Sequence, residues 1–144
     1  MSEFLWSRHA NPWSVWTAVV AFPLLVLALY RRSRLLLGGV LLFVPLNPLL
    51  FRPPSDDRAW ATRVVLGEQV WLDRGVLPSK EAAMAAASAP VYLATFGAAL
   101  RKSRWGTLGG IVLSMTLMLL FFARMVRLYD EQAATAPPER LGFR

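Results

Sequence analysis

The amino-acid sequence predicts an all-α integral membrane protein with four transmembrane helices, paired as two antiparallel hairpins, and one interfacial amphipathic helix. Hydrophobic residues make up 56% of the 144 residues, which is well above the average of soluble proteins. They gather in four apolar runs, and the excess positive charge gathers in two short turns between these runs. Such turns are typical of membrane topology signals, whereas nucleic-acid binding would require a basic face. We therefore predict a single membrane domain, residues 1–144, that binds no nucleic acid.

The four apolar runs are the predicted membrane spans, and they cover residues 15–30, 35–50, 82–100 and 108–125. The third and fourth runs are long enough to cross a hydrocarbon core of ~30 Å. The first two are close to the lower length limit, so they either span with the help of flanking aromatic residues or form a shallow re-entrant hairpin. We expect them to span. No cleavage pattern of a signal peptide precedes the basic turn after the first run, so we expect that run to be retained.

Two basic turns, residues 31–34 and 101–104, join the first run to the second and the third run to the fourth. Links this short imply antiparallel neighbours, hence two helical hairpins. Compact turns with three positive charges and no acid are difficult to translocate, so we expect both on the cytoplasmic side of a prokaryotic inner or plasma membrane. A plain count favours the reverse orientation, because six of the 16 Lys and Arg residues lie in the turns and ten lie on the other side.

The connector between the hairpins is predicted to contain the amphipathic helix, over residues 57–74. Two prolines stop the second span, and the polar segment 55–57 supplies N-cap groups and negative charge to the start of the helix. Gly75 is expected to end this helix, and Ser79 is expected to cap the third span. The helix is predicted to lie in the membrane interface or under the bundle.

The third span is rich in small residues, chiefly alanine together with Gly97, which allow close backbone packing between helices in lipid. We therefore expect this span to be the central helix of the bundle, with a kink near Pro90. The chain after the fourth span is different in character. Its last part, residues 131–144, contains two adjacent prolines and is predicted to be a loose, solvated tail.

Glu68 is the main candidate for a functional residue. On a helical wheel it falls in the middle of an apolar face made by Trp60, Ala61, Val64, Val65, Trp71 and Leu72. A carboxylate in such a place is usually paired, protonated or functional. One interpretation makes Glu68 a general acid or base, or a ligand for a proton or cation. The alternative is a structural ion pair with Arg124, with Arg127 or with an arginine of its own connector.

Further polar residues are predicted to share one side of the membrane with Glu68, namely His9, Asn11, Asn47, Arg124 and Tyr129. His9 is a second catalytic candidate, as a proton shuttle or metal ligand, but a single histidine more often caps or anchors an N-terminus at the interface. Asn11 before Pro12 suits the start of a helix. Asn47 fits either a polar pocket or a turn that ends the second span. The other side of the membrane holds only the basic turns.

Composition excludes several classes of site. The chain has no cysteine and one histidine, which argues against disulfides, iron–sulfur clusters and an all-protein zinc or di-iron site. Neither a nucleophile elbow, a phosphate-binding glycine loop, a zinc-protease motif nor a dinucleotide fingerprint occurs in the sequence. We therefore predict no metal and no cofactor.

Three sequence strings, HANPWSVWT, NPLLFRPP and WATRVVLGEQVWL, together resemble an uncharacterised family of small prokaryotic membrane proteins that is described only as a domain of unknown function. The resemblance covers residues 8–130, and it is the combination of strings that is specific. The family often has a further proline where Arg52 stands, so the loop that enters the amphipathic helix differs here. The resemblance implies a multi-pass membrane protein with no known activity, and no catalytic role is carried over.

Three functions remain open from the sequence. The first is a binding or accessory protein of the lipid bilayer, whose polar face docks a protein partner, a second copy of the chain or a lipid headgroup. The second is a membrane enzyme that uses Glu68, with His9, on a lipid-soluble substrate. The third is a proton-coupled transporter, which so few polar groups within the spans make the weakest of the three.

Overall fold

The computed structural model describes residues 3–135, and in this part of the chain helices are the only regular secondary structure, without a strand. The elements are α1 (Glu3–His9), α2 (Pro12–Arg31), α3 (Arg34–Leu46), the short 3-10 helix η1 (Asn47–Leu50), α4 (Trp60–Arg74), α5 (Lys80–Leu100) and α6 (Arg104–Thr135). The prediction of an all-α fold is confirmed.

Three helices, α2, α5 and α6, are long and apolar enough to cross a membrane. The fourth predicted span, residues 35–50, is helical but interrupted. Helix α3 has 13 residues, or about 20 Å of rise, and continues as η1 from Asn47 onward. Pro48 has no backbone N–H to extend the α-helical ladder, and here the chain tightens into the 3-10 form. Together α3 and η1 form an apolar segment, Arg34–Leu50, that is shorter than the other three candidates.

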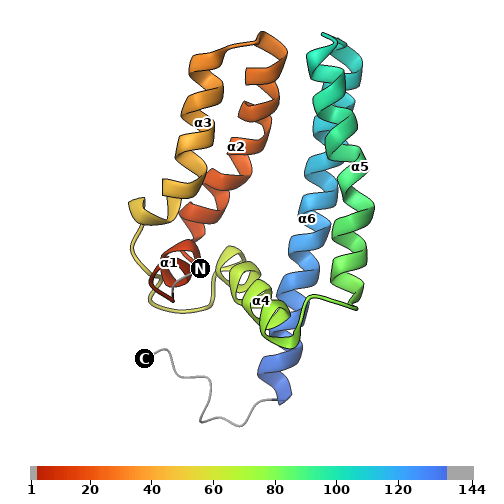
Figure 1. Ribbon diagram of the computed structural model, residues 1–144. Helices are drawn as coiled ribbons and strands as arrows, with labels where there is room; N and C mark the ends of the chain where they lie inside the picture. The colour runs from red at the N-terminus through yellow and green to blue at the C-terminus, as the bar shows by residue number, and fades with distance from the viewer. Residues whose placement is uncertain (1–2, 136–144) are drawn as a thin grey trace.

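The helices form two antiparallel pairs, α2 with α3 and α5 with α6 (Figure 1). Both tight turns lie at one end of these pairs, and α1, η1 and α4 lie at the other end. Each turn reverses the chain through a residue with positive φ, Arg32 at 55° and Lys102 at 59°. Ser33 then caps α3 by accepting a hydrogen bond from the backbone N–H of Leu36 at 3.3 Å.

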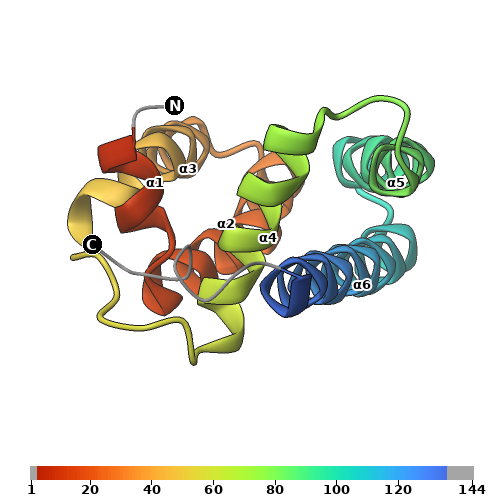
Figure 2. The same ribbon diagram turned by 90° about the horizontal axis from the view of Figure 1, so that it is seen from below.

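Helix α4 crosses beneath the two pairs (Figure 2), and it packs closely on α6 and less closely on α2. Its start differs from the prediction. The N-cap is Ala59, whose side chain cannot cap, and the helix begins at residue 60 and not at 57. The acids expected there have other partners, since Asp56 pairs with Arg58 at 2.6 Å and Asp57 accepts a hydrogen bond from Tyr129.

Two clusters of buried apolar side chains lie around α4, where it meets α6 and the start of α2. Val64 of α4 packs with Met125 and Val126 of α6, while Val65 packs with Val15 of α2. Gly67 lies directly against the backbone carbonyl of Met125, so close that a Cβ atom would overlap with it. A glycine inside a helix lowers stability by about 1 kcal/mol, and here it allows the two helix backbones to touch.

Helix α5 is not the central helix that its small residues predict. Of its most apolar window 11% is buried, against 33% for α2. Most of its alanines are exposed, including Ala83, Ala85, Ala86, Ala87, Ala89 and Ala94. The close contact with α6 uses instead Thr95, which touches Gly110 and shares a 3.1 Å hydrogen bond with Ser114. Small polar residues therefore make the packed seam, and the alanine face is left outside.

Helix α6 is longer than the predicted fourth span. It continues to Thr135, so residues 131–135 of the predicted loose tail are helical. Contacts with α4 hold this extension in place, because Arg63 pairs with Asp130 at 3.2 Å and Arg74 donates to Gln132 at 2.6 Å. The rest of the predicted tail, residues 136–144, lies outside the described residues.

Candidate functional site

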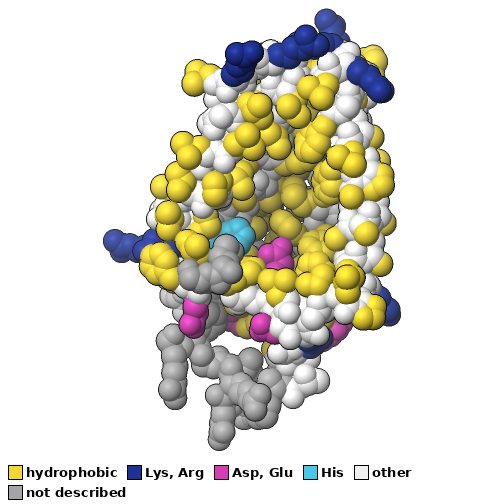
Figure 3. All heavy atoms as spheres, in the orientation of Figure 1, with side chains coloured by type: hydrophobic (Ala, Val, Ile, Leu, Met, Phe, Trp, Pro, Cys, Tyr) yellow, Lys and Arg dark blue, Asp and Glu magenta, His cyan; other side chains and the backbone are white. Residues whose placement is uncertain are grey.

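A hollow opens between the two helical pairs, which also touch, because Phe22 of α2 packs on Tyr92 and Phe96 of α5. Figure 3 shows it with hydrophobic side chains along its walls and acidic surface inside its lower part. Of the first pair, α2 makes the contacts with α5 and α6, and α4 crosses the lower end. The hollow is thus an apolar space whose floor is provided by the amphipathic helix.

Glu68 lies on the side of α4 that faces the bundle. It shares a stripe with Ala61, Val65 and Leu72, since residues three or four positions apart lie on one face of a helix. The stripe is buried at its start, where Ala61 and Val65 pack against Val15 of α2, and it is open at its end, where Leu72 is 46% exposed. Glu68 lies between these two and is partly buried. It therefore sits where the packed core gives way to accessible space.

The Glu68 carboxyl has no hydrogen-bond or ion-pair partner within residues 3–135. Burial disfavours its charged form and raises its pKa from an ordinary value of 4.5 to about 7. At neutral pH the side chain is therefore a mixture of the carboxylic acid and the carboxylate. A small change in surroundings, such as a bound cation, would shift that balance.

The structural ion pair that the sequence offered as an alternative for Glu68 does not form in the described part of the chain. Arg124 pairs instead with two other acids, Glu81 at 2.8 Å and Glu131 at 3.1 Å. The other basic candidate on α6, Arg127, is exposed. Glu81 lies at the start of α5 and Glu131 lies near the end of α6. Their carboxylates already pair with the guanidinium of Arg124.

His9 anchors α1 to α2. Its Nδ1 lies 3.3 Å from the hydroxyl of Ser14, which is fully buried, and its ring lies 6.4 Å from that of Trp6. Burial lowers the pKa of His9 below its ordinary value of 6.5, so the imidazole is neutral at pH 7. His9 therefore anchors α1 to α2, and it makes no hydrogen bond with Glu68.

The two asparagines fasten neighbouring segments to the start of α2. Asn47 is 1% exposed and donates to the backbone carbonyl of Ser14 at 2.8 Å, while Thr17 donates to its amide oxygen at 3.2 Å. Asn11 caps α2 by accepting from the N–H of Trp13 at 2.9 Å. It also donates to the carbonyl of Arg52 at 2.8 Å. His9 and Asn47 thus meet at Ser14, and the role of each is to join elements.

Tyr129 joins the connector to α6, because its hydroxyl donates to Asp57 at 2.8 Å. The predicted polar residues therefore lie at the same end of the fold but divide into separate contacts. His9, Asn11 and Asn47 hold the α1–α2–η1 region, whereas Arg124 and Tyr129 hold α5, α6 and the connector. Arg124 and Tyr129 are therefore already paired with other acids, and neither is hydrogen-bonded to Glu68.

Three residues of this region were not singled out from the sequence. Glu81 stands two positions after the Ser79 cap, and an acid in the first turn of a helix is explained by the helix dipole alone. Its contact with Arg124 of α6 therefore left no signal in the sequence. Ser14 has no distinguishing pattern. Gly67 does have one, since a glycine inside an amphipathic helix indicates a close approach of another backbone.

The site offers one titratable carboxyl, partly buried on an otherwise apolar face of α4. In residues 3–135 no group of three metal-binding side chains comes together. Chemically, the arrangement can accept a hydrogen bond, hold a cation or exchange a proton. Each of these needs a group from outside the described chain.

Comparison with known proteins gives a family without an assigned activity. The profile described as Family of unknown function (DUF6653) matches residues 2–142. No curated protein and no solved structure matches the chain. The resemblance inferred from the three sequence strings is confirmed at this level.

Proposed function

Because the chain belongs to the family of unknown function DUF6653, we propose its function from the site itself: a four-span membrane protein that binds an amphiphilic ligand in the hollow between the helical pairs. The ligand has an apolar body and a headgroup that carries an amine or another hydrogen-bond donor. Glu68 accepts that group. The observation that carries the proposal is the Glu68 carboxyl, which lies partly buried on the bundle side of α4 and has no hydrogen-bond or ion-pair partner in residues 3–135.

Membrane placement is part of this proposal. Helices α2, α5 and α6 span, and the apolar segment Arg34–Leu50 is the fourth, shorter crossing. The basic turns lie in the cytoplasm of a prokaryotic cell, and α4 lies at the opposite interface with its apolar face toward the bundle. This arrangement puts the Glu68 side chain close to the depth of lipid headgroups, where amphiphiles carry their polar groups.

The contrast between Glu68 and the other acids supports a ligand-binding role. Asp56, Asp57 and Glu81, which are also partly or fully buried, each have a basic or hydroxyl partner within the chain. Partial burial without a partner disfavours the charged form of a carboxyl. A ligand that donates a hydrogen bond to Glu68 would stabilise that charged form when it binds.

A membrane enzyme is the second candidate, and the observation that favours it is the pKa of Glu68. A value of about 7 suits a general acid or base at physiological pH. Binding is preferred because no second polar side chain within residues 3–135 is hydrogen-bonded to Glu68, as a catalytic pair would require. A proton-coupled transporter would use the same carboxyl and shares this weakness.

The test is ligand-dependent stability of the purified protein in a neutral detergent. We expect dodecylamine to raise the melting temperature of the wild type at pH 8, where Glu68 is ionised, and dodecanoic acid to have no such effect. Glu68→Gln should lose the response to the amine. Asp73→Asn is the matched control, since Asp73 is an exposed acid of the same helix, and it should keep the response. An equal response in Glu68→Gln and wild type would refute the proposal.

A further inference from the structure

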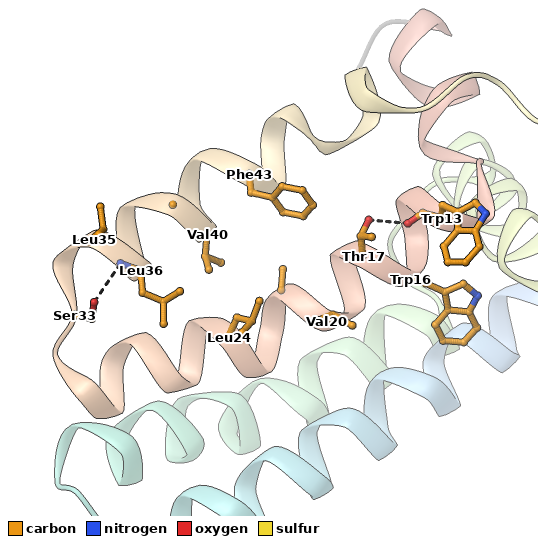
Figure 4. A pocket seen from close by; sticks show the side chains of 12 residues that line it. Trp13, Trp16, Thr17, Val20, Leu24, Ser33, Leu35, Leu36, Val40 and Phe43 are labelled. Carbon is orange, nitrogen blue, oxygen red and sulfur yellow. Dashed lines mark hydrogen bonds between the residues drawn. The ribbon is translucent and has the colours of Figure 1, made fainter.

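A second apolar space lies on the first helical pair, between α2 and α3. It is a groove of about 770 Å³ that runs from Ser33 at the basic turn toward Trp13 near the start of α2. Figure 4 shows Leu24 and Val20 of α2 and Leu36 and Val40 of α3 along it. Its lining is almost wholly apolar.

The groove exists because small side chains leave space between the two helices. Gly39 lines it, and a Cβ atom added at Gly39 would meet nothing within 4 Å. Figure 4 also shows α2 and α3 diverging from the turn toward Phe43. The space is therefore elongated and narrowest next to the turn.

The turn at the mouth of this groove carries Arg31, Arg32 and Arg34, all exposed. None of them has an ion-pair partner in the described part of the chain. The sequence between residues 4 and 55 contains no acid, so the segments that flank this turn along the chain carry no negative side chain. The second basic turn adds to the positive charge, because Lys102 lies 5.2 Å from the ring of Tyr30. The space-filling view shows basic but no acidic surface at this end (Figure 3).

We propose that the groove between α2 and α3 binds one anionic phospholipid, with an acyl chain along the groove and the phosphate at Arg31, Arg32 and Arg34. Ser33 connects the two parts, since it belongs to the turn and also lines the groove. Arginine pairs with phosphate by charge-assisted hydrogen bonds, and basic residues next to a membrane attract anionic lipids. The inference rests on the membrane placement proposed above but is independent of the role of Glu68.

The chain offers a matched pair of variants for the test. Gly39→Leu fills the groove, whereas Gly38→Leu adds the same side chain one position away, outside the groove lining. Neither added Cβ meets an atom within 4 Å, so neither change disturbs helix packing at its root. Bound lipid is counted by native mass spectrometry in a neutral detergent. The probes are phosphatidylglycerol, phosphatidylcholine with the same chains, and inorganic phosphate.

We expect the wild type and Gly38→Leu to bind one phosphatidylglycerol about tenfold or more tightly than phosphatidylcholine. Gly39→Leu should lose tight binding of both lipids. The triple variant Arg31→Gln, Arg32→Gln, Arg34→Gln should keep binding but lose the preference for the anionic lipid. Inorganic phosphate alone should not compete, because it has no chain to bury.

Three results would overturn the inference. Equal binding of both lipids by the wild type would remove the role of the arginines, and unchanged binding in Gly39→Leu would remove the groove. A dimer of the wild type that Gly39→Leu converts to a monomer would show that a second copy of the chain occupies the groove. If the protein does not span the membrane, alkaline carbonate would release the wild type from vesicles. This result would refute the proposed membrane placement, and it is distinct from the three results above.

Discussion

Replacing Glu68 with glutamine should stabilise the protein, and the gain should depend on pH. Glutamine keeps the shape of the side chain and resembles the neutral carboxylic acid. Folding raises the pKa of Glu68 from an ordinary 4.5 to about 7, so the folded state binds the proton more tightly than the unfolded chain. The contribution of this group to stability is therefore most favourable below pH 4.5, and it is lost as the pH rises through 7.

The size of the effect follows from that difference in pKa. Each pH unit between the two values corresponds to ~1.4 kcal/mol, so full ionisation lowers the free energy of unfolding by about 3–4 kcal/mol at most. The partial exposure of Glu68 reduces this figure, because solvent screens the charge. We expect Glu68→Gln to exceed the wild type by about 2 kcal/mol at pH 8. For a protein of this size that is on the order of 5 °C in melting temperature.

The assay is thermal unfolding of both proteins in one detergent at a series of pH values from 4.5 to 8.5. The difference between them should be close to zero at pH 4.5 and should grow as the pH rises through neutrality. Asp73→Asn should show no such growth, because Asp73 is exposed. A Glu68→Gln protein that is less stable than the wild type at pH 8 would refute the reasoning, since it would mean that the carboxylate has a stabilising partner.

Two further predictions concern the packing that holds α4 and α5 to α6. Gly67→Ala should lower the free energy of unfolding by about 1–3 kcal/mol, because its Cβ would meet the Met125 backbone, whereas Gly97→Ala, which has open space, should be neutral or stabilising. Chemical denaturation in detergent measures both, and an equal effect of the two would contradict the close contact. Glu81→Gln should lower stability by about 1–3 kcal/mol at neutral pH, because Arg124 loses a buried partner at 2.8 Å. A loss that stays the same when the pH is lowered until the carboxylate is protonated would contradict an ionic cause.

Local chemistry in the sequence predicted much of the secondary structure. Asn11 before Pro12 marked the start of α2, and Ser79 marked the start of α5, because N-caps act through hydrogen bonds to the next few residues. The prediction was wrong where a distant contact decides. Asp56 and Asp57 were expected to start α4, but Arg58 and Tyr129 bind them instead.

The candidate site shows the same division. The inward direction of Glu68 followed from helical periodicity, which is a local property. Its lack of a partner did not follow, because Arg124 was expected to lie within reach and its pairing with Glu81 depends on how α5 and α6 are placed. The alanine-rich face of α5 was also misjudged. Small residues permit close packing, but they do not determine which helix comes close.

The central claim is that the Glu68 carboxyl has no partner in residues 3–135 and titrates near neutral pH. Infrared difference spectroscopy of the protein in lipid vesicles measures this directly, because a protonated carboxyl has its own C=O stretching band. We predict a band that disappears with a midpoint near pH 7 and that is absent from Glu68→Gln. A wild-type spectrum in which Glu68 is fully ionised at pH 5.5 would contradict the account.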